Sequence, residues 1–375
     1  MGFETRLEAF QVEMCDIHEA VLTVDGKEIP CKGYRCAGSG TVEAPFYYMP
    51  NTDACSLAQC KGKIVMLDGG VGYWGYRDLI ENGAVGIITY DGNANYADED
   101  IDLRELRSFV REGSDNKKIP CVNINAKSAI KLVKQNAANA KIVLNQDEWI
   151  GDSHNVILDL PGETDEMIVL SAHYDSTLCH RVYTTICPEV LVFLVLQIIL
   201  DNIRITIARF LWCGSEERGL LGSKAYVAAH EEDLKKTVLN INLDMIGCIM
   251  GKFIACCTSE EKLVHYIEYL ASETGFGMAA RQGVYSSDST PFADKGIPAV
   301  SFARIASGNT ATIHNQYDTM DVMKAEHMAK DVAFITAFTE HMACAKHCPV
   351  SKEIPENMKE KLDIYLNRKR DNTSH

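Results

Sequence analysis

Apolar and polar positions along the first 148 residues predict short strands and helices in alternation. AVLTVDGKEI has the every-second-residue alternation of a half-buried strand, and KGKIVMLDGG predicts a buried strand that ends in glycines. YRDLIENGAVGIITYDG then predicts a helix, a glycine stop and a second buried strand. IPCVNINAKSAIKLVKQ repeats the order, with its helix over residues 126–135. These patterns indicate one small unit over residues 25–148.

The pattern over residues 149–348 predicts a larger α/β unit. Strands are expected in EMIVLSAHYDS, ARFLWC, TVLNINLDMIG and IPAVSFAR, and amphipathic helices in EEKLVHYIEYLASETGF and KAEHMAKDVAFITAFTEHMACAK. Alternating strands and helices are typical of a sheet flanked by helices. Residues 1–24 are expected to start this larger domain. Residues 349–375 are expected to form a charged C-terminal tail with a loosely attached helix and a frayed end.

Composition and charge narrow the class of protein. The chain has 375 residues, 52 acidic against 37 basic side chains, and a formal net charge of −15, which argues against nucleic acid or an anionic membrane as partner. The run VLVFLVLQIIL at 190–200 is shorter than the roughly 20 residues that span a bilayer, so no transmembrane helix is predicted.

Cysteine usage and the N-terminus predict a cytoplasmic protein. The fourteen cysteines are scattered without any C-x-x-C pair, which favours buried thiols in a reducing compartment over a disulfide scaffold. The first ten residues, MGFETRLEAF, lack the basic and apolar regions of a signal peptide.

Polar side chains that suit zinc follow the predicted strands of the larger unit. They are His173 with Asp175, Glu216 with Glu217, Asp244, and His314. Each motif alone is weak, because an E-E pair is usually a solvated loop and an isolated histidine is usually a satisfied loop residue. Asp244 is a stronger candidate, because it follows a buried strand and burying an unpaired carboxylate costs free energy. Ligands of α/β sheets bind outside the carboxyl ends of the strands, so these groups are expected to converge there.

Five motifs in order carry a specific resemblance. SAHYDS, WCGSEERGLLGSKAYV, NLDMIG, SSDSTPFADKGIPAVSF and IHNQYDTMD resemble the dizinc aminopeptidases of clan MH, metallopeptidase family twenty-eight. The resemblance implies a zinc-exopeptidase fold, with a mixed sheet flanked by helices, and two zinc ions. It implies that His173 and Asp244 bind one zinc and that Glu217 and His314 bind the other. It also implies that Glu216 is the general base and that Asp175 orients the His173 ring.

The sequence departs from this family after the H-x-D motif. The family has an aspartate bridging both zinc ions in a G-x-x-D-N-type turn, but no Asp or Asn lies between Asp175 and Asp201. Counting places the missing group at Thr184, whose neutral hydroxyl cannot replace an anion between two dications. A pair of compensating frameshifts over segment 178–208 is one interpretation, because codons for Leu178 to Leu200 can be chosen that also spell a string with Y-D-N and S-G. The resemblance also implies a helix before the first strand, and the chain as given is expected to begin after that helix.

The small unit resembles the protease-associated domain, a β-rich module inserted in aminopeptidases and receptors. That resemblance covers roughly residues 25–145 and implies a role in substrate access or partner binding. The chain is therefore predicted to be a zinc-dependent aminopeptidase acting on peptides, impaired as written because the bridging aspartate is absent. Two alternatives are a non-catalytic homologue that binds peptides or partners, and a single-zinc enzyme like glutaminyl cyclase.

Overall fold

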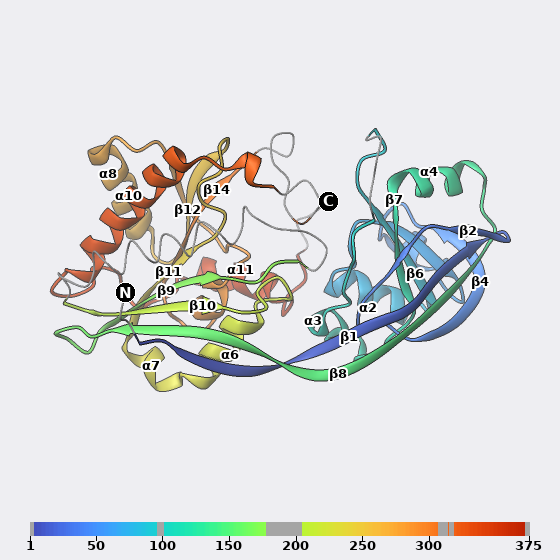
Figure 1. Cartoon of the computed structure of the whole chain (residues 1–375), viewed down its shortest axis with the longest axis horizontal. Coiled ribbons are helices and arrows are strands. Elements are labelled where there is room, and N and C mark those ends of the chain that lie inside the picture. The colour runs from blue at the N-terminus through green and yellow to red at the C-terminus, as the bar shows by residue number, and fades with distance from the viewer. Residues whose placement is uncertain (1–3, 96–100, 178–204, 307–313, 315–318, 372–375) are drawn as a thin grey trace. The chain divides into compact units, whose positions relative to one another are not determined.

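A computed structural model of the chain describes residues 4–95, 101–177, 205–306, 314 and 319–371. Contacts divide the chain into two compact units (Figure 1). The first comprises residues 1–10 and 152–375, and the second comprises residues 11–151. Thr184 and the apolar run 190–200 lie outside the described residues, as does all of segment 178–208 except residues 205–208.

The first unit is a mixed α/β fold around one sheet. Its strands lie in the order β13-β12-β14-β11-β9-β10-β8, of which β10, β9, β11 and β14 run parallel. β8 is antiparallel to β10, and β12 is antiparallel to β14 and parallel to β13. The strand bounds are β8 Asn139–Leu160, β9 Met167–His173, β10 Ile207–Cys213, β11 Thr237–Leu243, β12 Lys252–Thr258, β13 Ala279–Gln282 and β14 Ala299–Ile305.

Helices cover both faces of this sheet, which explains why its central strands are almost continuously apolar. Successive side chains of β9 alternate between the faces: Leu170 packs in the cluster with α8 and α10, and Val169 packs in the cluster with α6, α7 and α9. The helix bounds are α6 Leu221–Ala229, α7 Glu231–Lys236, α8 Glu261–Thr274, α9 Ser289–Asp294, α10 Ala325–Ala343 and α11 Glu356–Tyr365, with a 3₁₀ turn η2 at Met320–Val322.

The strand order reverses at β9. The chain passes from β9 to β10 on one side and then to β11 on the other, so the carboxyl end of β9 lies at the switch point of the sheet. Crevices form at such points, because the two connections leave in opposite directions. His173, the last residue of β9, is therefore at the place where α/β sheets bind ligands.

The second unit has a sheet in the order β8-β4-β5-β6-β7-β3, with β4, β5, β6 and β7 parallel. Residues 11–24 lie in this unit rather than with residues 152–375, because Leu22 and Val24 are buried in its core. The bounds are β1 Arg6–Val24, β2 Lys27–Ile29, β3 Lys32–Gly33, β4 Gly40–Tyr48, α1 Ala54–Leu57, β5 Ile64–Asp68, α2 Tyr73–Glu81, β6 Gly86–Asp91, α3 Ser108–Arg111, η1 Glu112–Ser114, β7 Cys121–Asn125 and α4 Ala126–Lys134.

The structure describes twelve of the cysteines and the lengths of the helices. Every cysteine that the structure describes is a free thiol, and most are buried. Among the described helices, none combines the length and the apolar character needed to cross a bilayer.

The C-terminal helix is docked, so the expectation of a loosely attached helix is wrong. Met358 and Leu362 of α11 are buried against Ala293 and Ala299 of the first unit. The polar composition of residues 349–375 hides this contact, because two apolar side chains four residues apart suffice to fix one face of a short helix.

Met358→Ala is therefore expected to lower the free energy of unfolding by about 2–5 kcal/mol, the usual cost of emptying a filled core position. Met358 is 0% exposed. Urea denaturation measures the effect, and Glu360→Ala on the exposed face of the same helix is the matched control, expected within about 0.5 kcal/mol of the parent. Equal effects of the two substitutions would show that α11 is not packed.

Candidate metal centre

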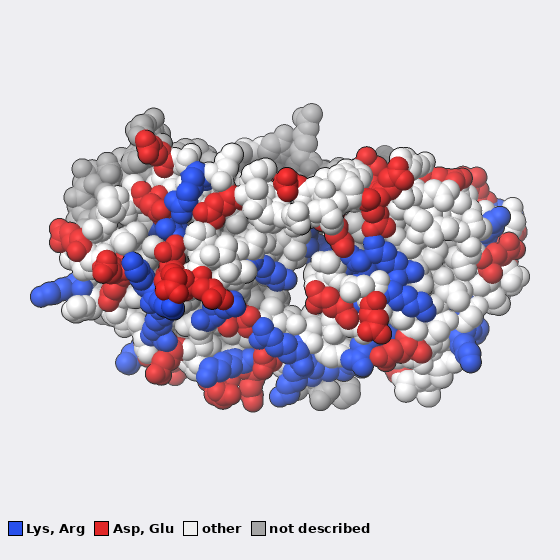
Figure 2. Space-filling model, turned by 90° about the horizontal axis from the view of Figure 1, so that it is seen from below, with Lys and Arg blue, Asp and Glu red and all other residues white. Residues whose placement is uncertain are grey.

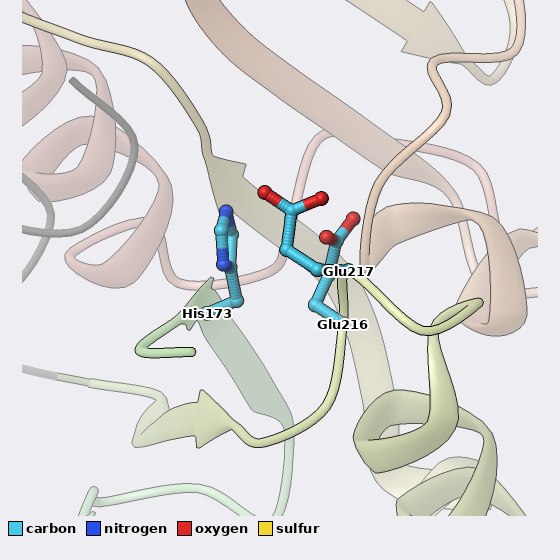
Figure 3. A group of neighbouring side chains, drawn as sticks. All are labelled: His173, Glu216 and Glu217. Atoms are coloured by element: carbon cyan, nitrogen blue, oxygen red, sulfur yellow. The ribbon is translucent and has the colours of Figure 1, made fainter. Parts of the chain in front are cut away.

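Three of the predicted site residues meet at the carboxyl edge of the first unit's sheet. His173 ends β9, and Glu216 and Glu217 follow β10. Their ligand atoms all lie within 4.8 Å of one another, and all three residues are buried. Figure 3 shows the imidazole ring and the two carboxylates converging from these separate elements. This is the one group of three or more His, Cys, Asp or Glu side chains within such reach in the described part of the chain.

The backbone after β9 fixes the orientation of His173. Its Nδ1 lies 3.0 Å from the main-chain carbonyl of Asp175, to which an Nδ1–H donates, whereas the Asp175 carboxylate is 3.8 Å away. Donation through Nδ1 leaves Nε2 free as a ligand atom. The group of Asp175 that lies nearest to the ring is thus its carbonyl, whereas the resemblance implies that Asp175 orients the ring through its carboxylate.

The Asp175 carboxylate instead holds the loop that carries the paired glutamates. Its two oxygens accept the main-chain N–H groups of Glu216 at 2.8 Å and of Glu217 at 3.2 Å. A single side chain thereby links the end of β9 to the residues after β10.

Asn155 of β8 hydrogen-bonds to both ends of this loop, at Gly214 and Gly222. Its Oδ1 accepts the Gly214 N–H at 3.2 Å, and its Nδ2 donates to the Gly222 carbonyl at 2.9 Å. A Cβ on Gly222 would lie 2.4 Å from the Asn155 Oδ1, which explains the glycine. Sequence reasoning missed Asn155, because nothing in HNVIL distinguishes this buried amide from an ordinary strand residue.

The other two predicted ligands reach the cluster in pairs that fit single metal ions. The His173 Nε2 lies 3.9 Å from the Asp244 Oδ1, and the His314 Nε2 lies 2.9 Å from the Glu217 Oε1. Two atoms that each sit about 2.0–2.2 Å from one zinc can be no more than about 4.4 Å apart. The pairings implied by the resemblance, His173 with Asp244 and Glu217 with His314, are therefore compatible with the structure.

The charge of the centre also fits a cation. The carboxyl groups of Asp175, Glu216, Glu217 and Asp244 are all at least four-fifths buried, and the imidazoles of His173 and His314 lie within ion-pair distance of three of them. Burial raises the pKa of Glu216 well above its usual range, and it also raises the pKa of Asp175. Burial by itself lowers the pKa of His173, but the facing carboxylates of Asp244, Glu216 and Asp175 raise it well above its usual value.

The buried Oε1 of Glu217 has no hydrogen-bond partner among the described residues, although the His314 ring lies within ion-pair distance of it. A carboxylate oxygen that is buried and not hydrogen-bonded is destabilising unless a positive charge satisfies it. The donor set of imidazoles and carboxylates is the set that zinc prefers.

Four non-glycine residues of the site loops have left-handed backbones. They are Ser215 with φ 56°, Leu220 with φ 61°, Met245 with φ 57° and His314 itself with φ 64°. Such conformations are sparsely populated and persist where surrounding contacts impose them, often at functional sites. No residue type at these positions signals the turn, so the sequence could not predict it.

Asp288 is a further buried carboxyl that sequence reasoning did not single out. It precedes α9 in the SSDSTPF motif and is 0% exposed. Its Oδ1 accepts a hydrogen bond from the Ser223 hydroxyl at 2.5 Å, and its Oδ2 has no partner among the described residues. Burial raises the pKa of Asp288 to about 6.

This burial predicts a pH-dependent stability. An unfolded Asp titrates near pH 3.9, so between about pH 4 and pH 6 the folded chain holds more protons at Asp288 than the unfolded chain. The stability of the metal-free parent should therefore fall as the pH rises through this window. Asp288→Asn should remove the part of the fall that Asp288 contributes, a gain of about 3 kcal/mol on the parent between pH 4 and pH 7, at about 1.4 kcal/mol per unit. Urea unfolding in chelator at several pH values measures this difference, and parallel profiles of parent and variant would contradict it.

Comparisons with known proteins give a family match over part of the chain and a shared fold. Residues 196–338 match the sequence profile of Peptidase family M28, a range that includes Glu216, Glu217, Asp244 and His314 and begins after His173 and Asp175. The comparison with curated proteins found no match.

Solved structures share the fold. An aminopeptidase from Aneurinibacillus sp. strain AM-1 is 23% identical with a TM-score of 0.73, covering 93% of this chain and 87% of its own. A zinc aminopeptidase from Bacillus subtilis is 21% identical with a TM-score of 0.73, covering 95% and 88%. A peptidase M28 precursor from Shewanella amazonensis SB2B is 20% identical with a TM-score of 0.72, covering 93% and 87%.

Proposed function

Because residues 196–338 carry a peptidase family M28 region on the fold of zinc aminopeptidases, we propose that the chain is built as a zinc-dependent aminopeptidase that removes N-terminal residues from peptides. The observation that carries the proposal is the convergence of His173, Glu216 and Glu217, with Asp244 and His314 at ligand-pair distances, at one sheet edge.

The residues of the centre have separable roles. His173 and Asp244 would hold one zinc, and Glu217 and His314 would hold the other. Bound zinc would supply acidity to a coordinated water, whose pKa falls to about 7. Glu216, which is not needed as a ligand in these pairs, accepts the proton of the attacking water and passes it to the leaving amine. Burial raises the pKa of Glu216, which makes its carboxylate a stronger proton acceptor than an exposed glutamate.

The chain as written is proposed to be impaired. The stretch between Asp175 and Asp201 contains neither Asp nor Asn, so no anion stands at Thr184 where the resembled family bridges its two zinc ions. Each zinc then has two protein ligands from the described set, fewer than the three that are usual in catalytic sites. The chain would accordingly behave as a weak metal binder, and the non-catalytic alternative applies to it in this form.

Peptides are the proposed substrates, and the second unit is proposed as a protease-associated module that lacks chemistry of its own. In its described residues, no group of His, Cys, Asp or Glu offers a metal site. Nucleic acid is an unsuitable partner for a chain of net charge −15, and Lys and Arg are interspersed with Asp and Glu on the face drawn in Figure 2.

Hydrolysis of paired peptides tests the proposal. A chain carrying Asp and Asn at positions 184 and 185 should, with zinc, cleave a peptide that has a free N-terminus and leave the N-acetylated peptide intact. Cleavage of both peptides would indicate an endopeptidase. Cleavage of neither, with zinc bound, would favour a binding protein.

A further inference from the structure

A buried ion pair joins β14 to α10 in the first unit. The Arg304 guanidinium makes a two-pronged contact with the Asp331 carboxylate, with Nε donating to Oδ2 at 2.9 Å and Nη2 donating to Oδ1. Asp331 is 0% exposed, and the guanidinium also lies 5.4 Å from the centre of the Phe253 ring. Burying such a pair contributes little to stability compared with apolar side chains of similar size. The hydrogen bonds that the two side chains make to the main chain are therefore more informative about the role of the pair than its charge.

Both partners bind the turn that follows Asp244, residues 244–251, here called the Asp244 loop. The Asp331 Oδ2 accepts the Gly247 N–H at 3.0 Å. The Arg304 Nη1 donates to the Gly251 carbonyl at 3.1 Å, and the Arg304 main-chain N–H donates to the Met245 carbonyl at 2.9 Å. The start, middle and end of the loop are thus fixed by two residues.

The backbone of the Asp244 loop needs such support. Met245 has φ 57° without being glycine, and Gly247 and Gly251 have φ 82° and 149°. Conformations of this kind cost about 1–3 kcal/mol at a non-glycine residue and persist only when contacts impose them. Met245 directly follows Asp244, so its conformation sets the direction in which the main chain leaves the sheet after Asp244.

The Asp244 loop also holds the segment 319–324, which follows His314. The Ile249 N–H donates to the Val322 carbonyl at 2.7 Å, and the Lys324 N–H donates to the Gly247 carbonyl at 3.3 Å. Cys248 and Met323 form an isolated β-bridge between the same two segments. Asp244 is a predicted ligand of one zinc and His314 of the other. The loop directly follows Asp244, and it contacts the segment that comes after His314 in the sequence.

We propose that Arg304 and Asp331 are a positioning pair that fixes the Asp244 loop and, through it, segment 319–324, so that one ion pair holds both the turn after Asp244 and the segment that comes after His314 in the sequence. The proposal rests on the proposed function for its purpose and on these contacts for its mechanism. Neither residue touches the predicted ligands, and both act through the loop.

Hydrogen exchange of the metal-free chain tests the coupling without requiring zinc. In Asp331→Asn, amides of both 245–251 and 319–324 should exchange about 10–100-fold faster, as expected for loss of a buried charged hydrogen bond. The double variant Arg304→Met with Asp331→Leu should do the same, and replacing both charges by apolar groups often leaves stability unchanged. Asp159→Asn, at the buried Arg209 of the same unit, is the matched control and should change neither segment. Unchanged exchange in either segment of the folded double variant would overturn the proposal.

Zinc affinity is the second readout. It is measured by competition with a chelator in the chain that carries Thr184→Asp and Thr185→Asn. The double variant should bind zinc about 10–100-fold more weakly, as when a residue behind a ligand is lost, and Asp159→Asn should bind as the parent does. Faster exchange with unchanged zinc affinity would overturn the positioning role. If the chain binds no zinc at all, the exchange result still decides the coupling, and only the proposed function fails.

Discussion

Restoring Tyr-Asp-Asn at positions 183–185, by Thr184→Asp and Thr185→Asn, is expected to raise peptide hydrolysis by about 10²–10³-fold or more. A metal centre contributes several kcal/mol to transition-state stabilisation, and each 1.4 kcal/mol is about tenfold in rate. As written, the chain has a neutral threonine at position 184. An aspartate there would add a third protein ligand to each zinc.

The charge of the new side chain carries this expectation. A chain with Thr184→Asn and Thr185→Asn differs from the restored chain by one carboxylate and is the matched control. It should remain as inactive as the parent, because an amide adds no anion between two dications. Initial rates on one peptide at saturating zinc measure the difference, and equal rates for parent, control and restored chain would refute the bridging role.

Glu216→Gln in the restored chain is expected to keep zinc and lose about 10²–10⁴-fold in turnover, the usual contribution of a general base. Glutamine preserves the shape of the buried side chain and the N–H that donates to Asp175, but it cannot take the proton. The loss should appear in kcat more than in KM, because a proton transfer acts in the transition state.

Glu217→Gln provides the contrast. Glu217 is the neighbour whose Oε1 lies 2.9 Å from the His314 Nε2, so its loss should lower zinc content before it lowers turnover per bound zinc. Metal analysis and rates on both variants separate the two roles. Near-normal turnover in Glu216→Gln would remove Glu216 from the mechanism.

The positions of most site residues could be predicted, because they lie at or just after the ends of apolar strands. SAH, LWC and NINL are strongly strand-like, and parallel strands bring their carboxyl ends to one edge. The strand pattern alone therefore predicts that His173, Glu216, Glu217 and Asp244 lie near one another. The ligand roles of these residues came from the family resemblance, and the structure shows distances with which those roles are compatible.

The supporting contacts could not be predicted, because they join residues far apart in the chain. Asn155 and Gly222 are 67 positions apart, and Arg304 and Asp331 are 27 apart on different elements. Side chains of these types are usually exposed, and only the tertiary fold shows that these are buried. The packing of α11 could not be predicted for the same reason, since only two of its side chains, Met358 and Leu362, are buried in this cluster.

Zinc content per chain tests the central claim most directly. The chain as written and the chain with Thr184→Asp and Thr185→Asn are loaded with zinc, dialysed together and analysed for metal. We expect one weakly held zinc or none in the chain as written and two in the restored chain. Two tightly held zinc ions in the chain as written would contradict this account and would mean that another residue supplies the bridge.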